Sequence, residues 1–203
     1  MPRLTFIVVA FGDYYQLRTC LSSLVDQTVD DLEVIVVDNT PATDVVTRDN
    51  LDLCHMDPRI RYTNTSQQTC IRDLGLRHSY CLYTATEIGA AMATGDFLCF
   101  PNQDSYYAPV FAERMLRVAG TTGSDIVYCD FVHGVPGRPY HVTESACCVG
   151  MIDKTSFILR RSLFPGFPDK HTDYEKADGL MIEKLARAGV ARRRLAECLV
   201  FHN

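Results

Sequence analysis

Two hydrophobic patterns alternate along the chain: continuous apolar runs, and apolar residues that recur at helical spacing. Residues 4–11 and 32–38 are almost continuously apolar, which is typical of strands that are covered on both faces. Between them, Leu17, Leu21 and Leu24 recur at helical spacing and predict an amphipathic helix. A strand, a helix and a second strand in direct succession form a βαβ unit. We therefore expect an α/β fold in which the two strands are parallel.

Further elements follow with less regular spacing. Two glycines are expected to end helices, Gly95 after the helix at 87–94 and Gly189 after the last helix. Residues 133–150 contain three glycines, two prolines and two histidines without periodicity, and they predict a long surface loop of a kind that is often functional. The other predicted strands are 60–63, 96–100, 125–131, 157–161 and 198–203, and the other predicted helices are 109–119 and 172–188.

Length and charge narrow the possible classes of protein. The chain has 203 residues, 47% of them hydrophobic, which suits one domain with a substantial core. A net charge of −5 argues against a nucleic-acid binder, and the basic run at 192–194 is interpreted as the solvated end of an element. No apolar stretch approaches the roughly 20 residues that a membrane-spanning helix needs. We expect a cytoplasmic protein, with peripheral contact to the inner face of the membrane left open.

The cysteines point to a reducing compartment. There are nine of them, and an odd number without a C-x-x-C pair argues against a disulfide framework or a zinc site. Cys99 and Cys129 lie inside apolar runs and are expected to be small core residues.

The stretch DFLCFPNQDSYYAP, residues 96–109, joins a predicted buried strand directly to three polar side chains. Asn102, Gln103 and Asp104 follow the carboxyl end of that strand. One interpretation is a polar turn before the next helix, and the other is a site for a cation and a sugar nucleotide.

Polar residues also follow the first two strands, at 12–13 and at Asp38. Because ligands of open parallel sheets bind outside the carboxyl ends of the strands, these positions predict a common binding edge. Neither a G-x-G-x-x-G nor a G-x-x-x-x-G-K-[ST] motif is present, which argues against a dinucleotide dehydrogenase and a P-loop NTPase.

Three blocks of the sequence resemble the GT-A glycosyltransferases of family 2. LTFIVVAFGDYYQLRTCLSSLVDQTVDDLEVIVVDNT (4–40) resembles the family's opening strand, its L..cL.Sl..Q helix and its strand ending VVDDgS. EIGAAMATGDFLCFPNQDSYYAPVFAERM (87–115) resembles RNiGia.A.GdyiaflDdDD...p..l. ADGLMIEKLARAG (177–189) stands where the family has its acidic acceptor-site helix, while 50–80 and 133–150 are the least recognisable segments.

The resemblance implies the fold and its division. We expect one GT-A (Rossmann-like) domain over 1–203, with a mostly parallel central sheet flanked by helices. Residues 1–104 would form the nucleotide-binding half and residues 105–203 the acceptor-side half.

The resemblance also implies which residues bind the nucleotide. Ala10 and Phe11, at the end of the first strand, would cradle the base, and Asp38 would contact it. Asn102 replaces the first carboxylate of the family's D-x-D element, and its amide can still form a hydrogen bond with a ribose hydroxyl.

Metal binding and catalysis are assigned in the same way. Asp104 matches the last carboxylate of D-x-D, which in the family ligates the Mn²⁺ or Mg²⁺ that bridges the donor's diphosphate. His202 would be a further metal ligand. Asp178 would be the general base, with Asp173 and Glu175 close enough in the sequence to compete for that role.

The resemblance thus implies an inverting, divalent-metal-dependent glycosyltransferase. It would move a sugar from a nucleotide-diphospho-sugar, UDP-linked in the first instance, to a glycan or lipid-linked acceptor in bacterial surface-glycan synthesis. Two departures, Asn102 and the Thr86-Glu87 pair in place of Arg-Asn, favour an alternative: a degenerate relative that binds nucleotide or a partner without transfer. A nucleotidyltransferase ranks last, because AFGDYY has one glycine and no nearby basic residue for a triphosphate.

Overall fold

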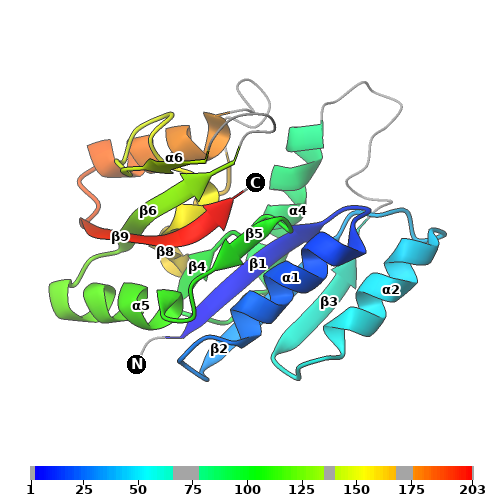
Figure 1. Cartoon of the computed structure of the whole chain (residues 1–203). Coiled ribbons are helices and arrows are strands. Elements are labelled where there is room, and N and C mark those ends of the chain that lie inside the picture. Colours follow the sequence, from blue (N-terminus) through cyan, green and yellow to red (C-terminus); the bar gives the residue numbers. More distant parts are fainter. Residues whose placement is uncertain (1–2, 66–77, 135–139, 168–175, 203) are drawn as a thin grey trace.

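A curled sheet of nine strands runs through the described part of the chain, with helices on both faces (Figure 1). The structure is a computed structural model that describes residues 3–65, 78–134, 140–167 and 176–202. The first four strands along the chain are β1 (Leu4–Ala10), β2 (Leu32–Asp38), β3 (Ile60–Asn64) and β4 (Phe97–Cys99). β1 pairs in parallel with β2 and β4, and β2 pairs in parallel with β3, so the expected βαβ unit is confirmed.

The rest of the sheet is mixed. Its strands are β5 (Ser105–Tyr107), β6 (Ile126–His133), β7 (His141–Thr143), β8 (Phe157–Arg160) and β9 (Arg192–His202). β9 is parallel to β6, whereas β8 is antiparallel to β4 and β6, β5 to β9, and β7 to β6. The main order is β3-β2-β1-β4-β8-β6-β9-β5. The expected α/β fold is therefore confirmed, with parallel pairing predominant only in its first part.

β7 corrects the interpretation of 133–150 as a surface loop. It pairs with the end of β6 in antiparallel register. His141 and Val142 are both exposed, so this short strand shows no apolar alternation that could be recognised in the sequence. β5, which is equally short, was missed for the same reason: three residues are too few to display a period of two.

Helices cover the two faces of the sheet (Figure 1). α1 (Tyr14–Val25), α2 (Val45–Cys54) and α5 (Phe111–Thr122) lie on one face, and α4 (His78–Met92) and α6 (Ala177–Arg187) lie on the other. α2 was not predicted, and α4 starts well before the predicted 87–94. The predicted start of the last helix, at 172–175, lies outside the described residues. None of the described helices is long and apolar enough to cross a membrane.

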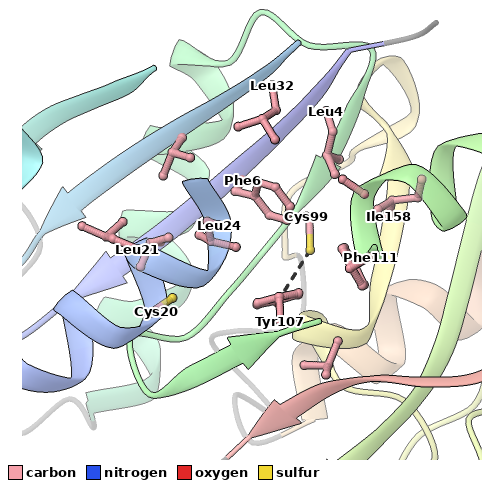
Figure 2. Close-up of a cluster of buried hydrophobic side chains, with 14 of the residues drawn as sticks. Leu4, Phe6, Cys20, Leu21, Leu24, Leu32, Cys99, Tyr107, Phe111 and Ile158 are labelled. Carbon is pink, nitrogen blue, oxygen red and sulfur yellow. Dashed lines mark hydrogen bonds between the residues drawn. The ribbon is translucent and has the colours of Figure 1, made fainter. Parts of the chain in front are cut away.

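An aromatic cluster fills the core on the α1 and α5 side (Figure 2). The rings of Phe6, Tyr107 and Phe111 pack together, with centroids 4.8–6.1 Å apart. The Tyr107 hydroxyl donates to the carbonyl of Thr155 at 2.8 Å and lies 3.8 Å from the Cys99 thiol. Tyr107 thereby buries its ring and satisfies its hydroxyl at once. Cys99 and Cys129 are fully buried, which confirms them as core residues.

Gly95 does not end α4 as predicted. The helix ends at Met92, and Gly95 is absent from the glycines with positive φ. Gly95 instead lies against β1, where its N–H donates to the Thr5 hydroxyl at 3.0 Å. A Cβ atom at this position would lie 2.6 Å from that oxygen and 2.9 Å from the carbonyl oxygen of Arg3. Gly189, with φ of +83°, follows α6 in the predicted left-handed conformation.

We predict opposite effects of alanine at two glycines. Gly95→Ala should lower the free energy of unfolding by about 1–3 kcal/mol, because the methyl group meets the backbone of β1. Gly120→Ala, in the exposed part of α5 with nothing within 4 Å, should raise it by about 0.5–1 kcal/mol through helix propensity. Urea unfolding of both variants measures the difference. Equal stability of the two variants would contradict the close packing assigned to Gly95.

Candidate functional site

A cavity of about 280 Å³ opens at the carboxyl ends of β1 and β2, beside the residues that follow β4. It lies at the edge where the sequence predicts a binding site. Its wall is formed by Val9, Phe11, Gln16, Asn39, Leu82, Asn102, Gln103, Asp104 and His202.

Gln103 fastens the loop after β4 to the end of β1. Its side-chain amide donates to the Phe11 carbonyl at 3.1 Å, and its amide oxygen accepts from the Phe11 N–H at 2.7 Å. Asn102 also forms a bridge with Val9, so the loop continues the sheet for one more residue. The N-Q-D stretch is therefore both a structured turn and a wall of the cavity, and its two interpretations are compatible.

Asp104 and His202 come together across this loop. The Asp104 carboxylate lies 3.6 Å from Nδ1 of His202. The Ser105 hydroxyl and the Asn102 amide also lie near His202 Nδ1, at 3.3 and 3.4 Å. This meeting depends on the antiparallel pairing of β5 with β9, in which Ser105 is directly opposite His202. Residues almost a hundred positions apart in the chain thus share one wall.

The residues at this wall are compatible with a divalent cation. Among the described residues, no group of three or more His, Cys, Asp or Glu side chains is arranged to hold a metal ion. Mg²⁺ in nucleotide sites, however, is usually held by one or two carboxylates together with substrate phosphates and water. Asp104 and His202, an oxygen and a nitrogen donor facing a cavity, suffice for such a shared site.

Asp38 lies inside the protein rather than on the cavity wall. It is fully buried, and its carboxylate accepts from the Thr40 N–H, the Asn50 amide and the Tyr62 hydroxyl at 2.8–3.1 Å. Its neighbour Asn39 lines the cavity instead. A buried carboxylate with three donors organises the turn after β2. The contact of Asp38 with a base stays a prediction.

Ala10 and Phe11 differ in their access to the cavity. Ala10 is fully buried, and its carbonyl accepts from the Asn39 N–H at 2.8 Å. Phe11 lines the cavity, although its N–H and carbonyl both engage Gln103. Of this pair, Phe11 is thus the residue that forms part of the cavity wall. Asp13, another polar residue after β1, caps α1 by accepting from the Gln16 N–H.

Asp178 lies at the start of α6, almost completely buried. Its two carboxylate oxygens accept from the N–H groups of Lys154 and Gly179 at 2.9 and 2.7 Å. Burial, followed by the charge of Asp153, raises the pKa of Asp178 to about 6. A carboxyl with a pKa near neutrality suits proton transfer. The competing residues Asp173 and Glu175 lie outside the described residues.

Sequence reasoning missed the short 3₁₀ helix η2 (Lys154–Ser156) and the residues around it. The carboxylate of Asp153 caps η2, accepting from the N–H and the hydroxyl of Thr155 at 2.8 and 2.7 Å. Charge interactions link Asp153 to both His202 and Asp178. The only signal in the sequence was an Asp-Lys pair before an apolar strand, which is also common on protein surfaces.

His133 is a second missed residue. It lies opposite His202 in the parallel pairing of β6 with β9, and the two ring centroids are 5.3 Å apart. Burial, then the neighbouring His202, lowers the pKa of His133. His133 therefore lies next to His202 without itself lining the cavity.

Glu87, one of the departures from the family pattern, has a structural contact. Its carboxylate accepts from the Phe167 N–H at 2.7 Å and so fixes the segment between β8 and α6 to α4. The rings of Phe167 and Tyr83 pack 4.5 Å apart beside this bond. The acidic residue thus anchors the chain on the side of the sheet that carries Asp178.

Comparison with known proteins agrees with this arrangement. The model of the family "Glycosyl transferase family 2" matches residues 5–174. Putative glycosyltransferase EpsH of Bacillus subtilis (strain 168) is 28% identical over 130 residues, which are 64% of this chain and 34% of EpsH. The chain therefore spans about a third of that relative.

Solved structures share the fold. S. aureus TarS 1-349 superposes with a TM-score of 0.74 at 18% identity, over 99% of this chain and 60% of TarS 1-349. The mannosyltransferase PcManGT from Pyrobaculum calidifontis, in complex with GDP-Man and Mn²⁺, gives 0.71 at 17% identity, over 98% of this chain and 56% of PcManGT. The family model covers most of the chain, which therefore belongs to glycosyl transferase family 2.

Proposed function

We propose that this protein transfers a sugar, with inversion, from a nucleotide-diphospho-sugar to the hydroxyl group of an acceptor. The observation that carries the proposal is the meeting of Asp104 and His202, 3.6 Å apart, on the wall of the cavity at the carboxyl edge of the sheet. Family membership makes sugar transfer the chemistry to test first.

The nucleotide would occupy the part of the cavity that adjoins β1 and β2. Val9 and Phe11 would supply apolar surface for a base, and Asn39, whose amide oxygen accepts from the Thr65 hydroxyl at 3.3 Å, lies on the same wall. Support for the identity of the nucleotide is divided between two neighbours. TarS 1-349 is known in complex with UDP-GlcNAc and PcManGT with GDP-Man. We propose UDP as the first candidate.

Asp104 and His202 would hold Mn²⁺ or Mg²⁺ together with the phosphates of the donor. A divalent cation bound there would neutralise the diphosphate and make it a better leaving group. Asn102 adds no charge to this wall, but its amide can orient a ribose hydroxyl or the His202 ring. One carboxylate in place of two predicts weaker metal affinity in the absence of donor than a D-x-D pair would give.

Asp178 would act as the general base. Its carboxylate oxygens are held by two backbone N–H groups, so the side chain has a fixed orientation. A single base that removes the acceptor's proton while the hydroxyl attacks the anomeric carbon gives one displacement and inverts the configuration. The acceptor would approach over residues 105–203, and we propose a glycan or a lipid-linked glycan.

A second candidate function is nucleotide binding without transfer. The observation in its favour is that only two side chains able to bind a metal, Asp104 and His202, meet at this wall among the described residues. The replacement of a carboxylate by Asn102 points in the same direction. The two candidates are separated by the measurements below.

We predict that Asp104→Ala abolishes the metal-dependent part of nucleotide binding, because it removes the one carboxylate among the described residues that line the cavity. Calorimetric titration of UDP, GDP and dTDP with and without Mn²⁺ should give a metal-dependent affinity for one nucleotide. Asp104→Ala should weaken that affinity by at least about tenfold. Asp49→Ala, an exposed carboxylate on α2, is the matched control and should bind as the wild type does.

Asn102→Asp is the complementary variant, and it should tighten Mn²⁺ binding by restoring a carboxylate. Unchanged affinity in Asp104→Ala would exclude the metal assignment. No binding of any nucleotide by the wild type in the presence of Mn²⁺ would favour the second candidate function.

We predict that Asp178→Asn leaves UDP binding intact but lowers sugar transfer by about a hundredfold or more, since the amide cannot accept the proton. In the wild type, transfer should fall as the pH drops through about 6, because the base must be ionised and its pKa is raised to that value. Product formation from a panel of nucleotide sugars and glycan acceptors measures both effects. Transfer retained by Asp178→Asn would move the base to Asp173 or Glu175, which Asp173→Asn and Glu175→Gln then distinguish.

A further inference from the structure

A buried lysine lies between the two parts of the proposed transfer site. Lys154 is only 3% exposed, which is rare for a lysine and costly unless its charge is compensated. Its ammonium group donates to the carbonyl of Phe100 at 3.1 Å, and its backbone N–H donates to Asp178 at 2.9 Å. One residue thus contacts both the end of β4 and the proposed base.

These two contacts reach both halves of the site. Phe100 follows β4 and precedes the loop that carries Asn102 and Asp104. Asp178 lies in the first turn of α6, on the other side of η2. The side chain of Lys154 thus contacts the strand that leads to the metal wall, while its backbone contacts the base.

The turn that carries Lys154 is firmly held. The Thr155 carbonyl accepts from the Tyr107 hydroxyl, and Asp153 and Ser156 form a reciprocal cap around η2. Lys154, Thr155 and Ser156 are all buried. The ammonium group consequently has a fixed place in the fold, as preorganised electrostatics require.

The charges around Lys154 are predominantly negative. Asp153, Asp178 and Asp104 each raise the pKa of Lys154, and burial, the largest influence, lowers it. The groups that act electrostatically on Asp178 in turn are Asp153 and Lys154 on the η2 side and Tyr83 on α4. Asp153 disfavours the ionised form of Asp178, whereas the Lys154 ammonium favours it.

We propose that Lys154 is a positioning residue of the transfer site, whose buried ammonium group holds the end of β4 and supplies positive charge to the group of carboxylates around Asp178. The inference rests on the proposed function, in which Asp178 is the base. Lys154 need not touch the substrate, and its effect is exerted through Asp178 and through the loop that carries Asp104.

The effect of methionine at this position distinguishes the proposed role of Lys154 from a purely structural one. If Lys154 only filled space, methionine would replace it with little functional effect, because the two side chains have similar length and the site is buried. If Lys154 supplies the counter-charge, methionine leaves the neighbouring carboxylates uncompensated, and the ionisation of Asp178 must change.

The test is the pH titration of the Asp178 carboxyl carbon by ¹³C NMR, with the signal assigned from Asp178→Asn. In Lys154→Met the midpoint should rise by about one pH unit or more, the scale expected for an opposite charge nearby. The pH at which the transfer rate falls on the acid side should rise by the same amount. Lys184→Met, an exposed lysine on α6, is the matched control and should leave the midpoint where it is.

Asp153→Asn should shift the midpoint of the Asp178 titration in the opposite direction. The variant therefore distinguishes a loss of charge from a general disturbance of the structure. Its amide oxygen can still accept from Thr155, so η2 stays capped, while the loss of negative charge should lower the midpoint of Asp178. If Lys154→Met does not fold, Lys154→Gln carries the same expectation as Lys154→Met.

An unchanged midpoint in a folded Lys154 variant, or shifts of equal sign in the Lys154 and Asp153 variants, would overturn the proposal. The NMR titration requires no transfer. Failure of the Lys154 inference is therefore distinct from failure of the proposed function, which the transfer assay of Asp178→Asn reports.

Discussion

The parallel pairing of β1 with β2 and β4 is the constraint on which the site depends. β1 is buried along its whole length, and each of its residues is in register with β2, from Leu4 opposite Leu32 to Ala10 opposite Asp38. Three strands therefore point toward the same edge, and residues that follow them line one cavity. The double hydrogen bond between Gln103 and Phe11 fastens the loop after β4 to that edge. These two hydrogen bonds help to fix the position of Asp104, the residue that follows Gln103.

The second half of the sheet brings the remaining chemistry to the same edge. Because β5 turns back and pairs with β9, His202 is carried to Asp104. η2 carries Lys154, whose ammonium group contacts the Phe100 carbonyl after β4 and whose backbone N–H contacts Asp178. The wall of the cavity thus carries Asn102 and one carboxylate, that of Asp104. A separate group of charged residues, Asp153 and the buried Lys154 and Asp178, lies at η2 and the start of α6. The substitution of Asn102 for a carboxylate and the presence of a buried ammonium group are consistent with one another, since both would reduce the negative charge near the diphosphate of the proposed donor.

Much of the fold could be predicted because long elements carry strong periodic signals. β1, β2, the core face of α5 and the left-handed Gly189 all follow from hydrophobic pattern and cap chemistry. The elements that were missed, β5 and β7, are three-residue strands whose existence depends on a distant partner. Gly95 was misinterpreted for a related reason: a glycine that follows a helix and a glycine required by a neighbouring strand look alike in the sequence, and only the approach of Thr5 distinguishes them.

The sequence by itself determined the α/β class, the binding edge after the strands, the resemblance to a family, and Asp104, His202 and Asp178 as the residues to examine. Local periodicity and residue chemistry suffice for the fold class and the binding edge, whereas the three residues follow from the resemblance. Only the tertiary structure decided which polar residues line the cavity: Asp38 is enclosed by three donors, whereas the next residue, Asn39, forms part of the wall. It alone revealed Lys154 and Asp153 beside Asp178. Burial and charge compensation depend on contacts between segments far apart in the chain, and no local pattern encodes such contacts.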